Sequence, residues 1–249
     1  MANFDQNRMQ TGVGAHDSAI DQGLRSYMLS VYNYMAGGLA ITGVIAYLAF
    51  SMAVTQTGAG LELTSTGVAL YSSPLKWVVM LAPLGLVFFL SARISKLSVA
   101  GAQISFWLFA GLMGLSLSSI FLIYTGNSIT QVFFVTAAAF GGLSLYGYTT
   151  KRDLSAMGSF LIMGVIGVLI ASVVNIFLQS SALQFAVSVI GVLVFAGLTA
   201  YDTQRIKEMY FEGDGVATAS KKAIMGALSL YLDFINMFMF LLQLFGDRR

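Results

Sequence analysis

Long apolar stretches alternate with short polar connections along most of the chain, and this pattern predicts membrane-spanning helices. A helix needs about 20 apolar residues to cross about 30 Å of hydrocarbon. The stretches that approach this length are 29–53, 77–92, 104–124, 130–150, 160–178, 183–203 and 223–245. We therefore expect an all-α membrane protein built as a seven-helix bundle, without β-strands.

Composition agrees with the hydropathy pattern. Of the 249 residues, 57% are hydrophobic and only 10% are charged, and the mean hydropathy is +0.80. Such a chain has too little polar surface to cover a water-soluble globule of this size. Cysteine is absent, which excludes disulfides and thiolate chemistry.

The chain divides into a short polar segment and one long apolar domain. Residues 1–28 are polar and lack the apolar core of a signal peptide, so we expect a mobile cytoplasmic tail. Residues 29–249 contain no linker and form the transmembrane domain. The connections at 126–129 and 179–182 are so short that we expect antiparallel neighbouring helices on either side of each.

The positions of the cationic residues predict an orientation. With seven spans and a cytoplasmic N-terminus, ten of the 13 Lys and Arg residues fall on the cytoplasmic side, and Lys76, Arg248 and Arg249 fall outside. The positive-inside rule therefore favours this orientation. A re-entrant last segment would also fit the charges, because it would move Arg248 and Arg249 inside, but the length of 223–245 favours a seventh span.

Two acids interrupt the last two apolar stretches. Asp202 lies at the end of 183–203, and Asp233 lies inside 223–245. A charged side chain at bilayer depth costs about 2.5 to 3.5 kcal/mol on insertion scales, so an acid in such a place is a candidate functional residue. Counted along helices that end near 209 and begin near 223, the acids lie roughly 10 Å and roughly 15 Å from the cytoplasmic ends.

The last stretch carries its polar residues on one face. Ser229, Asp233 and Asn236 have the spacing of helical neighbours, while leucine, phenylalanine and methionine cover the other faces. Because a polar face is costly against lipid, we expect this helix to lie at the centre of the other six.

The depths of the two acids would allow them to meet. Two carboxylates in contact cannot both ionise cheaply, so such a pair would titrate as a unit. In the alternative reading, each acid caps a helix or pairs with a cation such as Arg205 or Lys222.

Three sequence segments resemble the Bax inhibitor family in its bacterial branch. They are "YTGNSITQVFFVTAAAFGGLSLYGYTTKRDLSAMGSFL" at 124–161, "YDTQRIK" at 201–207 and "ALSLYLDFINMF" at 227–238. The two acids occur in the order and spacing of the family, and the resemblance covers all but the N-terminal tail. It implies a seven-helix fold that surrounds a central last helix.

The resemblance also implies a function, a pH-sensitive calcium leak channel or transporter. Asp202 and Asp233 match the aspartate pair that senses protons and lines the ion pathway, where calcium would be held weakly and transiently. Arg93 in "FFLSARISK" is the nearest match to an arginine that latches the closed pore, and a plain anchor in an inner loop is the alternative. Ser229 and Asn236 would support the polar face.

The expected partners are the lipid bilayer and calcium ions, with no cofactor, no nucleic acid and membrane-protein partners that the sequence does not identify. The expected location is the inner membrane of a bacterium. One alternative function is a regulatory membrane protein that acts by partner binding in stress or cell-death control, as relatives in the family imply.

A second alternative is an intramembrane aspartyl protease. Against it, Asp233 follows Leu230, Tyr231 and Leu232, without the glycines that open the helix before the second acid of those enzymes. The only histidine, His16, lies in the tail, which excludes a histidine site in the bundle. We therefore expect no enzyme activity.

Overall fold

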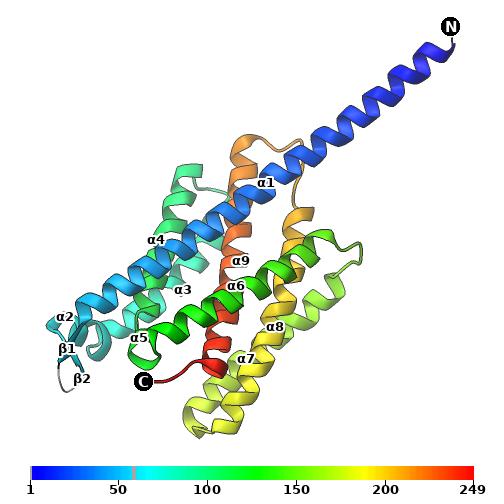
Figure 1. Ribbon diagram of the computed structural model, residues 1–249. Helices are drawn as coiled ribbons and strands as arrows, with labels where there is room; N and C mark the ends of the chain where they lie inside the picture. The colour runs from blue at the N-terminus through cyan, green and yellow to red at the C-terminus, as the bar shows by residue number, and fades with distance from the viewer. Residues whose placement is uncertain (1, 58–59) are drawn as a thin grey trace.

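The computed structural model describes residues 2–57 and 60–249, with side chains at 22–55 and 60–249. In this part of the chain, seven helices are long and apolar enough to cross a membrane. They are Gln22–Ala53, Leu75–Arg93, Val99–Ile123, Gly126–Thr149, Ser155–Leu178, Ser181–Glu208 and Val216–Phe245. The predicted all-α, seven-span membrane fold is confirmed (Figure 1).

The elements follow one another with short connections. Their order is α1 (Ala2–Ala53), β1 (Val54–Thr57), β2 (Gly60–Leu63), α2 (Ser65–Gly67), the π-helical turn η1 (Val68–Ser72), α3 (Leu75–Arg93), α4 (Val99–Leu117), α5 (Ile120–Ile123), α6 (Gly126–Thr149), α7 (Ser155–Leu178), α8 (Ser181–Glu208) and α9 (Val216–Phe245). The third span is thus made of α4 and the short α5.

The expectation that the chain has no strands is wrong for the segment after α1. Strands β1 and β2 pair as an antiparallel hairpin, with Val54 opposite Leu63. Val54, Thr55 and Thr57 are β-branched and favour extended backbone. Gly60 has φ +128°, a conformation that side chains rarely adopt.

Helix α1 starts well before residue 29, where the apolar stretch begins. It is continuous from Ala2 and projects from one end of the bundle (Figure 1). Tyr27 and Met28 are buried in the core, and Leu24 packs against it. These contacts explain why the first candidate span begins at Gln22. The mobility expected of residues 1–28 stays a prediction.

Helix α9 occupies the centre of the bundle, as the sequence predicts. It packs against α1, α4, α6 and α8, and Figure 1 shows it behind α1 and α6. Leu230 and Tyr231 on α9 are fully buried. The helix runs unbroken for 30 residues, so the chain does not turn back within it.

Glycines let helix backbones approach each other at two crossings. A Cβ at Gly114 on α4 would lie 2.7 Å from the carbonyl oxygen of Thr42 on α1. A Cβ at Gly147 on α6 would collide with the backbone of Ala200 on α8. In lipid, such close packing replaces the hydrophobic drive that joins helices in water.

The tight connection between α7 and α8 makes them antiparallel neighbours, as predicted. Gln179 adopts the left-handed conformation with φ 49°, and the Ser180 hydroxyl accepts from the Leu183 amide at 3.3 Å to cap α8.

The same prediction is wrong for the connection at the start of α6. Helix α4 packs on α1, α3 and α9, whereas α6 packs on α8 and α9. The C-terminal residues fill the corner between α5 and α6: the Arg249 amide donates to the Ile123 carbonyl at 2.9 Å, and the Thr125 amide donates to the Asp247 carbonyl at 3.0 Å. These bonds tie the C-terminal residues to the connection between α5 and α6.

Candidate functional site: the acid pair between α8 and α9

Helices α8 and α9 pack against each other in an antiparallel arrangement. Ile206 lies over Gly226 near one end, where a Cβ on the glycine would be 3.0 Å from the isoleucine Cγ2. Near the other end, the Ser188 hydroxyl donates to the Gln243 side-chain oxygen at 3.0 Å. Side chains that face each other between these two contacts are therefore held close together.

The two predicted acids face each other in this interface. The carboxyl groups of Asp202 and Asp233 lie within hydrogen-bonding reach of each other. Asp233 is only 4% exposed, whereas Asp202 is half-buried. Of the two carboxyl oxygens of Asp233, Oδ2 is buried and has no hydrogen-bond partner among the described residues.

The charges near the pair are unequally distributed. The positive charge of Arg205, one helical turn from Asp202 on α8, interacts electrostatically with the carboxyl group of Asp202. Within the described part of the chain, Asp202 is the charged group that interacts electrostatically with Asp233. Lys222, a possible partner on sequence grounds, instead pairs with Asp214 at 2.5 Å. Asp233 is therefore a buried acid whose charged neighbour is another acid.

The candidate latch, Arg93, lies elsewhere in the structure. It is exposed at the end of α3, and its carbonyl accepts from the Lys96 amide at 2.9 Å. None of the described interactions joins Arg93 to either acid of the pair. Its latch role stays a prediction that would require α3 to move.

The two supporting polar residues of α9 differ in their surroundings. Ser229 is half-buried. The Asn236 side-chain amide donates to the Leu232 carbonyl of its own helix at 2.8 Å. The structure therefore brings the two acids together but does not join Asn236 to them. The side chain of His16 lies outside the described residues.

A chain of hydroxyl groups links three helices beside the pair, and the sequence analysis missed it. The Tyr32 and Ser144 hydroxyls are 2.7 Å apart, and Ser144 lies 3.0 Å from the Thr203 hydroxyl. Thr203 follows Asp202 directly on α8. The signal in the sequence was weak, because Ser and Thr side chains in apolar helices also form hydrogen bonds to the backbone of their own helix.

A polar pocket lies at the opposite end of the α8–α9 interface from Arg205. It encloses about 400 Å³ and includes Asn175, Gln179, Gln184 and Gln243 in its lining. Phe240 also lines this pocket, and its ring is stacked on Phe195 with ring centroids 6.0 Å apart. Phe240 stands two helical turns from Asp233 on α9, on the side of the acid that leads toward this pocket.

The acids alone make a poor permanent metal site. No group of three or more His, Cys, Asp or Glu residues is gathered in the described part of the chain. Calcium prefers six to eight oxygen ligands, and two carboxyl groups provide four oxygens. The pair can attract a divalent cation, but it cannot enclose one.

Comparison with known proteins gives consistent results over almost the whole chain. The model of the family "Inhibitor of apoptosis-promoting Bax1" matches residues 24–249. An inner membrane protein of Escherichia coli, YbhL, is 48% identical over 229 residues, which cover 91% of this chain and 94% of that protein. Uncharacterized proteins of Rickettsia prowazekii and Caulobacter vibrioides are 47% and 49% identical over 238 and 236 residues, 94% of this chain in both cases and 94% and 93% of those proteins.

Proposed function

Because this chain belongs to the Bax inhibitor family, we propose that it is a pH-sensitive calcium leak in the bacterial inner membrane, gated by the proton shared between Asp202 and Asp233. The membrane assignment rests on the similarity to the Escherichia coli inner membrane protein. The N-terminus is cytoplasmic in this proposal, because that orientation places most cationic residues inside.

One observation carries the proposal: a buried acid meets a second acid and no cation. A structural salt bridge would place Arg or Lys beside Asp233, but Asp202 is the charged group that acts on it. Ionisable residues inside membranes are expensive and typically mark ion or proton pathways. An acid pair with one member on the central helix therefore favours a role in titration.

The shared proton would hold the closed arrangement. When one carboxyl group is protonated, it donates a short, charge-assisted hydrogen bond to the other, and this bond joins α8 to α9. Loss of the proton leaves two adjacent negative charges, and gain of a second proton removes the charge that strengthens the bond. Either change biases a bistable helix packing toward a hydrated state.

In the closed state, two stacked aromatic rings would block the ion pathway. Calcium that enters the amide-lined pocket from outside would meet the stacked rings of Phe240 and Phe195 before it reached the acids. Opening would require these rings to separate. Beyond them, two acids would attract the ion yet release it, since conduction needs sites that bind weakly enough to leave.

The alternatives have less support. A protease would need water at both acids, but α8 and α9 run as unbroken helices through Asp202 and Asp233, and Asp233 is 4% exposed. A regulatory protein that acts by partner binding would not require paired acids in its interior. Calcium flux through the purified protein distinguishes this last alternative from a leak.

The experiment is calcium entry into liposomes that contain the purified protein and an enclosed calcium indicator. We expect entry above that of empty liposomes, and a changed pH profile in Asp202→Asn and Asp233→Asn. Asp153→Asn, which changes an exposed acid in the α6–α7 connection, serves as the control and keeps the wild-type profile. Absence of entry at every pH, with folded protein in the bilayer, would refute the proposal.

A further inference from the structure

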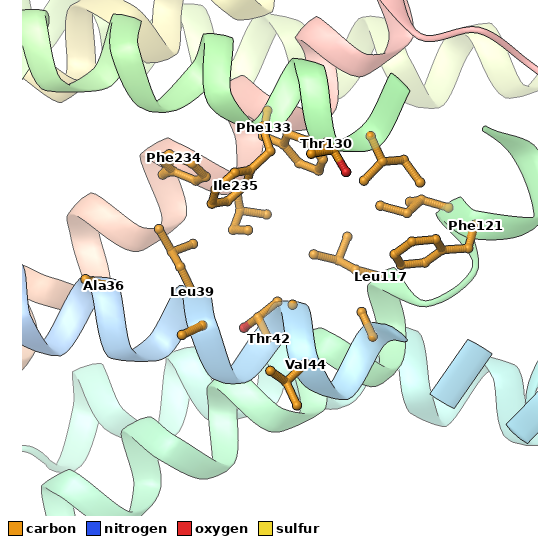
Figure 2. Close-up of a pocket in the computed structure, with 16 residues that line it drawn as sticks. Ala36, Leu39, Thr42, Val44, Leu117, Phe121, Thr130, Phe133, Phe234 and Ile235 are labelled. Atoms are coloured by element: carbon orange, nitrogen blue, oxygen red, sulfur yellow. The ribbon is translucent and has the colours of Figure 1, made fainter. Parts of the chain in front are cut away.

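A deep apolar groove separates α1 from α6, and nothing in the proposed function uses it. The cavity encloses about 550 Å³ between α1, α5, α6 and α9 (Figure 2). Its floor is the central helix, because Phe234, Ile235 and Phe238 of α9 line it. A second cavity, of about 560 Å³, lies between the same two helices toward the opposite end of the bundle.

The groove opens to the bilayer. Helices α1 and α6 are not among the closely packed helix pairs, and small residues of α1, Ala36, Ala40 and Gly43, border the cavity. At its rim, Val44 is 59% exposed and Phe133 is 37% exposed. Both helices are membrane spans, so the opening between them faces acyl chains.

The chemistry of the lining excludes water as a stable occupant. The hydroxyl groups of Thr42 and Thr130 are the side-chain polar groups of the lining. Thr42 already donates to the Ala110 carbonyl at 2.9 Å and lies 2.6 Å from the Tyr231 hydroxyl. A buried water needs two to four polar partners, whereas an unfilled apolar wall forfeits dispersion contacts that hydrocarbon would restore.

A cation lies near one end of the groove, with one aromatic ring between it and the lining residue Phe121. The Arg249 guanidinium lies 5.9 Å from the ring centroid of Phe50, and that ring stacks on Phe121, which lines the groove, at 5.3 Å. Arg249 Nε donates to the Tyr124 carbonyl at 3.3 Å. The two terminal nitrogens of Arg249 have no partner among the described residues, and a guanidinium offers them in the geometry that phosphate accepts.

We propose that the groove between α1 and α6 binds one phospholipid of the bilayer, with an acyl chain against α9 and the phosphate on Arg249. The apolar cavity would hold the acyl chain, the lateral opening would admit that chain from the bilayer, and the nearby cation would bind the phosphate. The bound chain touches the helix that carries Asp233. This places a lipid contact on the central helix, which the other helices otherwise screen from the membrane.

The test is photolabelling of the full-length protein in phosphatidylcholine and phosphatidylglycerol vesicles that carry a diazirine on an acyl chain, followed by mapping of the labelled peptides. We expect label on the α9 residues that line the groove, which are at most 8% exposed to water. Label on α7, whose Phe160 and Ile176 are exposed, provides the internal standard. This readout does not depend on calcium flux.

Two pairs of variants make the test specific. Gly43→Leu adds a side chain to the wall of the groove at a position where a Cβ meets nothing within 4 Å, and Gly85→Leu on α3 is the matched control, because a Cβ there also meets nothing within 4 Å. We expect Gly43→Leu to lower α9 labelling about tenfold, a change of 1.4 kcal/mol in binding. Arg249→Gln should lower it, whereas Lys76→Gln, the loss of a cation on α3, should not.

The outcomes separate the possibilities. Unlabelled α9 in the wild-type protein, or equal labelling in Gly43→Leu, would overturn the site. Labelling that survives Arg249→Gln would overturn the assignment of the phosphate. Displacement of the label by added free fatty acid, with no effect of added phospholipid, would identify a different occupant and overturn the proposal as stated.

Discussion

Replacing Asp233 by asparagine should abolish the alkaline rise in calcium entry while the fold persists. The substitution keeps the size of the side chain and supplies an amide that can donate to the Asp202 carboxylate. It removes the ionisable group at the position that is 4% exposed. The α8–α9 contact therefore keeps one hydrogen bond at every pH at which Asp202 is ionised.

The repulsion between two ionised carboxylates sets the size of the effect in the wild-type protein. Two unit charges about 4 Å apart repel by about 4 kcal/mol at an effective dielectric constant of about 20. That energy changes a two-state ratio about a thousandfold. A closed population of about 99% would then fall to about 10% when the pair loses its shared proton.

Acidification should act more weakly than alkalinisation. A second proton removes the charge assistance of the hydrogen bond without creating repulsion, and hydrogen bonds to charged groups contribute about 1.5 to 3 kcal/mol. The wild-type flux should therefore pass through a minimum where the pair holds one proton, with a steeper rise on the alkaline side. Asp233→Asn should lack the alkaline rise.

The assay is calcium entry into proteoliposomes over a series from about pH 5 to about pH 8, the range in which physiological switches operate. Asp202→Asn provides the reciprocal variant, and empty liposomes report passive permeability at each pH. Asp233→Asn protein that elutes and melts like wild type, yet retains the alkaline rise, would refute the reasoning.

Three further predictions concern the scaffold. Gly147→Ala should lower the free energy of unfolding of the purified protein by about 1 to 3 kcal/mol through overpacking. Gly142→Ala on the same helix, where a Cβ meets nothing within 4 Å, should leave it unchanged. Equal melting temperatures of the two variants would contradict the packing argument. Gln204→Leu should expose the α6–α7 connection to trypsin, because the Gln204 side chain accepts from the buried Leu154 amide at 2.8 Å, and an unpaired buried donor costs about 1 to 3 kcal/mol; unchanged cleavage would refute this anchor. Hydrogen bonds from the side chain and the backbone amide of Ser155 lower the pKa of Asp153, so the stabilisation that Asp153 gives to the start of α7 is present above the ordinary aspartate value and is lost as pH falls through the lowered pKa. Asp153→Ala should speed amide exchange at the start of α7 at neutral pH and not in acid, and equal exchange at neutral pH would contradict this prediction.

The sequence predicted the spans because membrane hydrocarbon imposes one strong requirement, about 20 apolar residues per crossing. It also predicted the central helix, since the polar face of α9 at Ser229, Asp233 and Asn236 could not face lipid. The estimated depths of Asp202 and Asp233 showed that the two acids could meet, but the sequence did not exclude separate partners for each, because depth does not determine which faces of two helices are in contact.

Other features depended on contacts that no local pattern encodes. The C-terminal residues pair with the chain at Ile123 and Thr125, more than 120 residues away in sequence. The hydroxyl chain from Tyr32 to Thr203 needs three helices in register. The β1–β2 hairpin was missed because its strands have only four residues each.

The Oδ2 atom of Asp233, which has no hydrogen-bond partner among the described residues, has a consequence for the evolution of this protein. Replacing buried polar groups by apolar residues of similar volume is often neutral or stabilising. Selection for heat tolerance alone would therefore tend to replace both acids with residues such as leucine and methionine. A laboratory lineage evolved only to survive high temperature should lose the acids early and become a sturdier but inactive bundle.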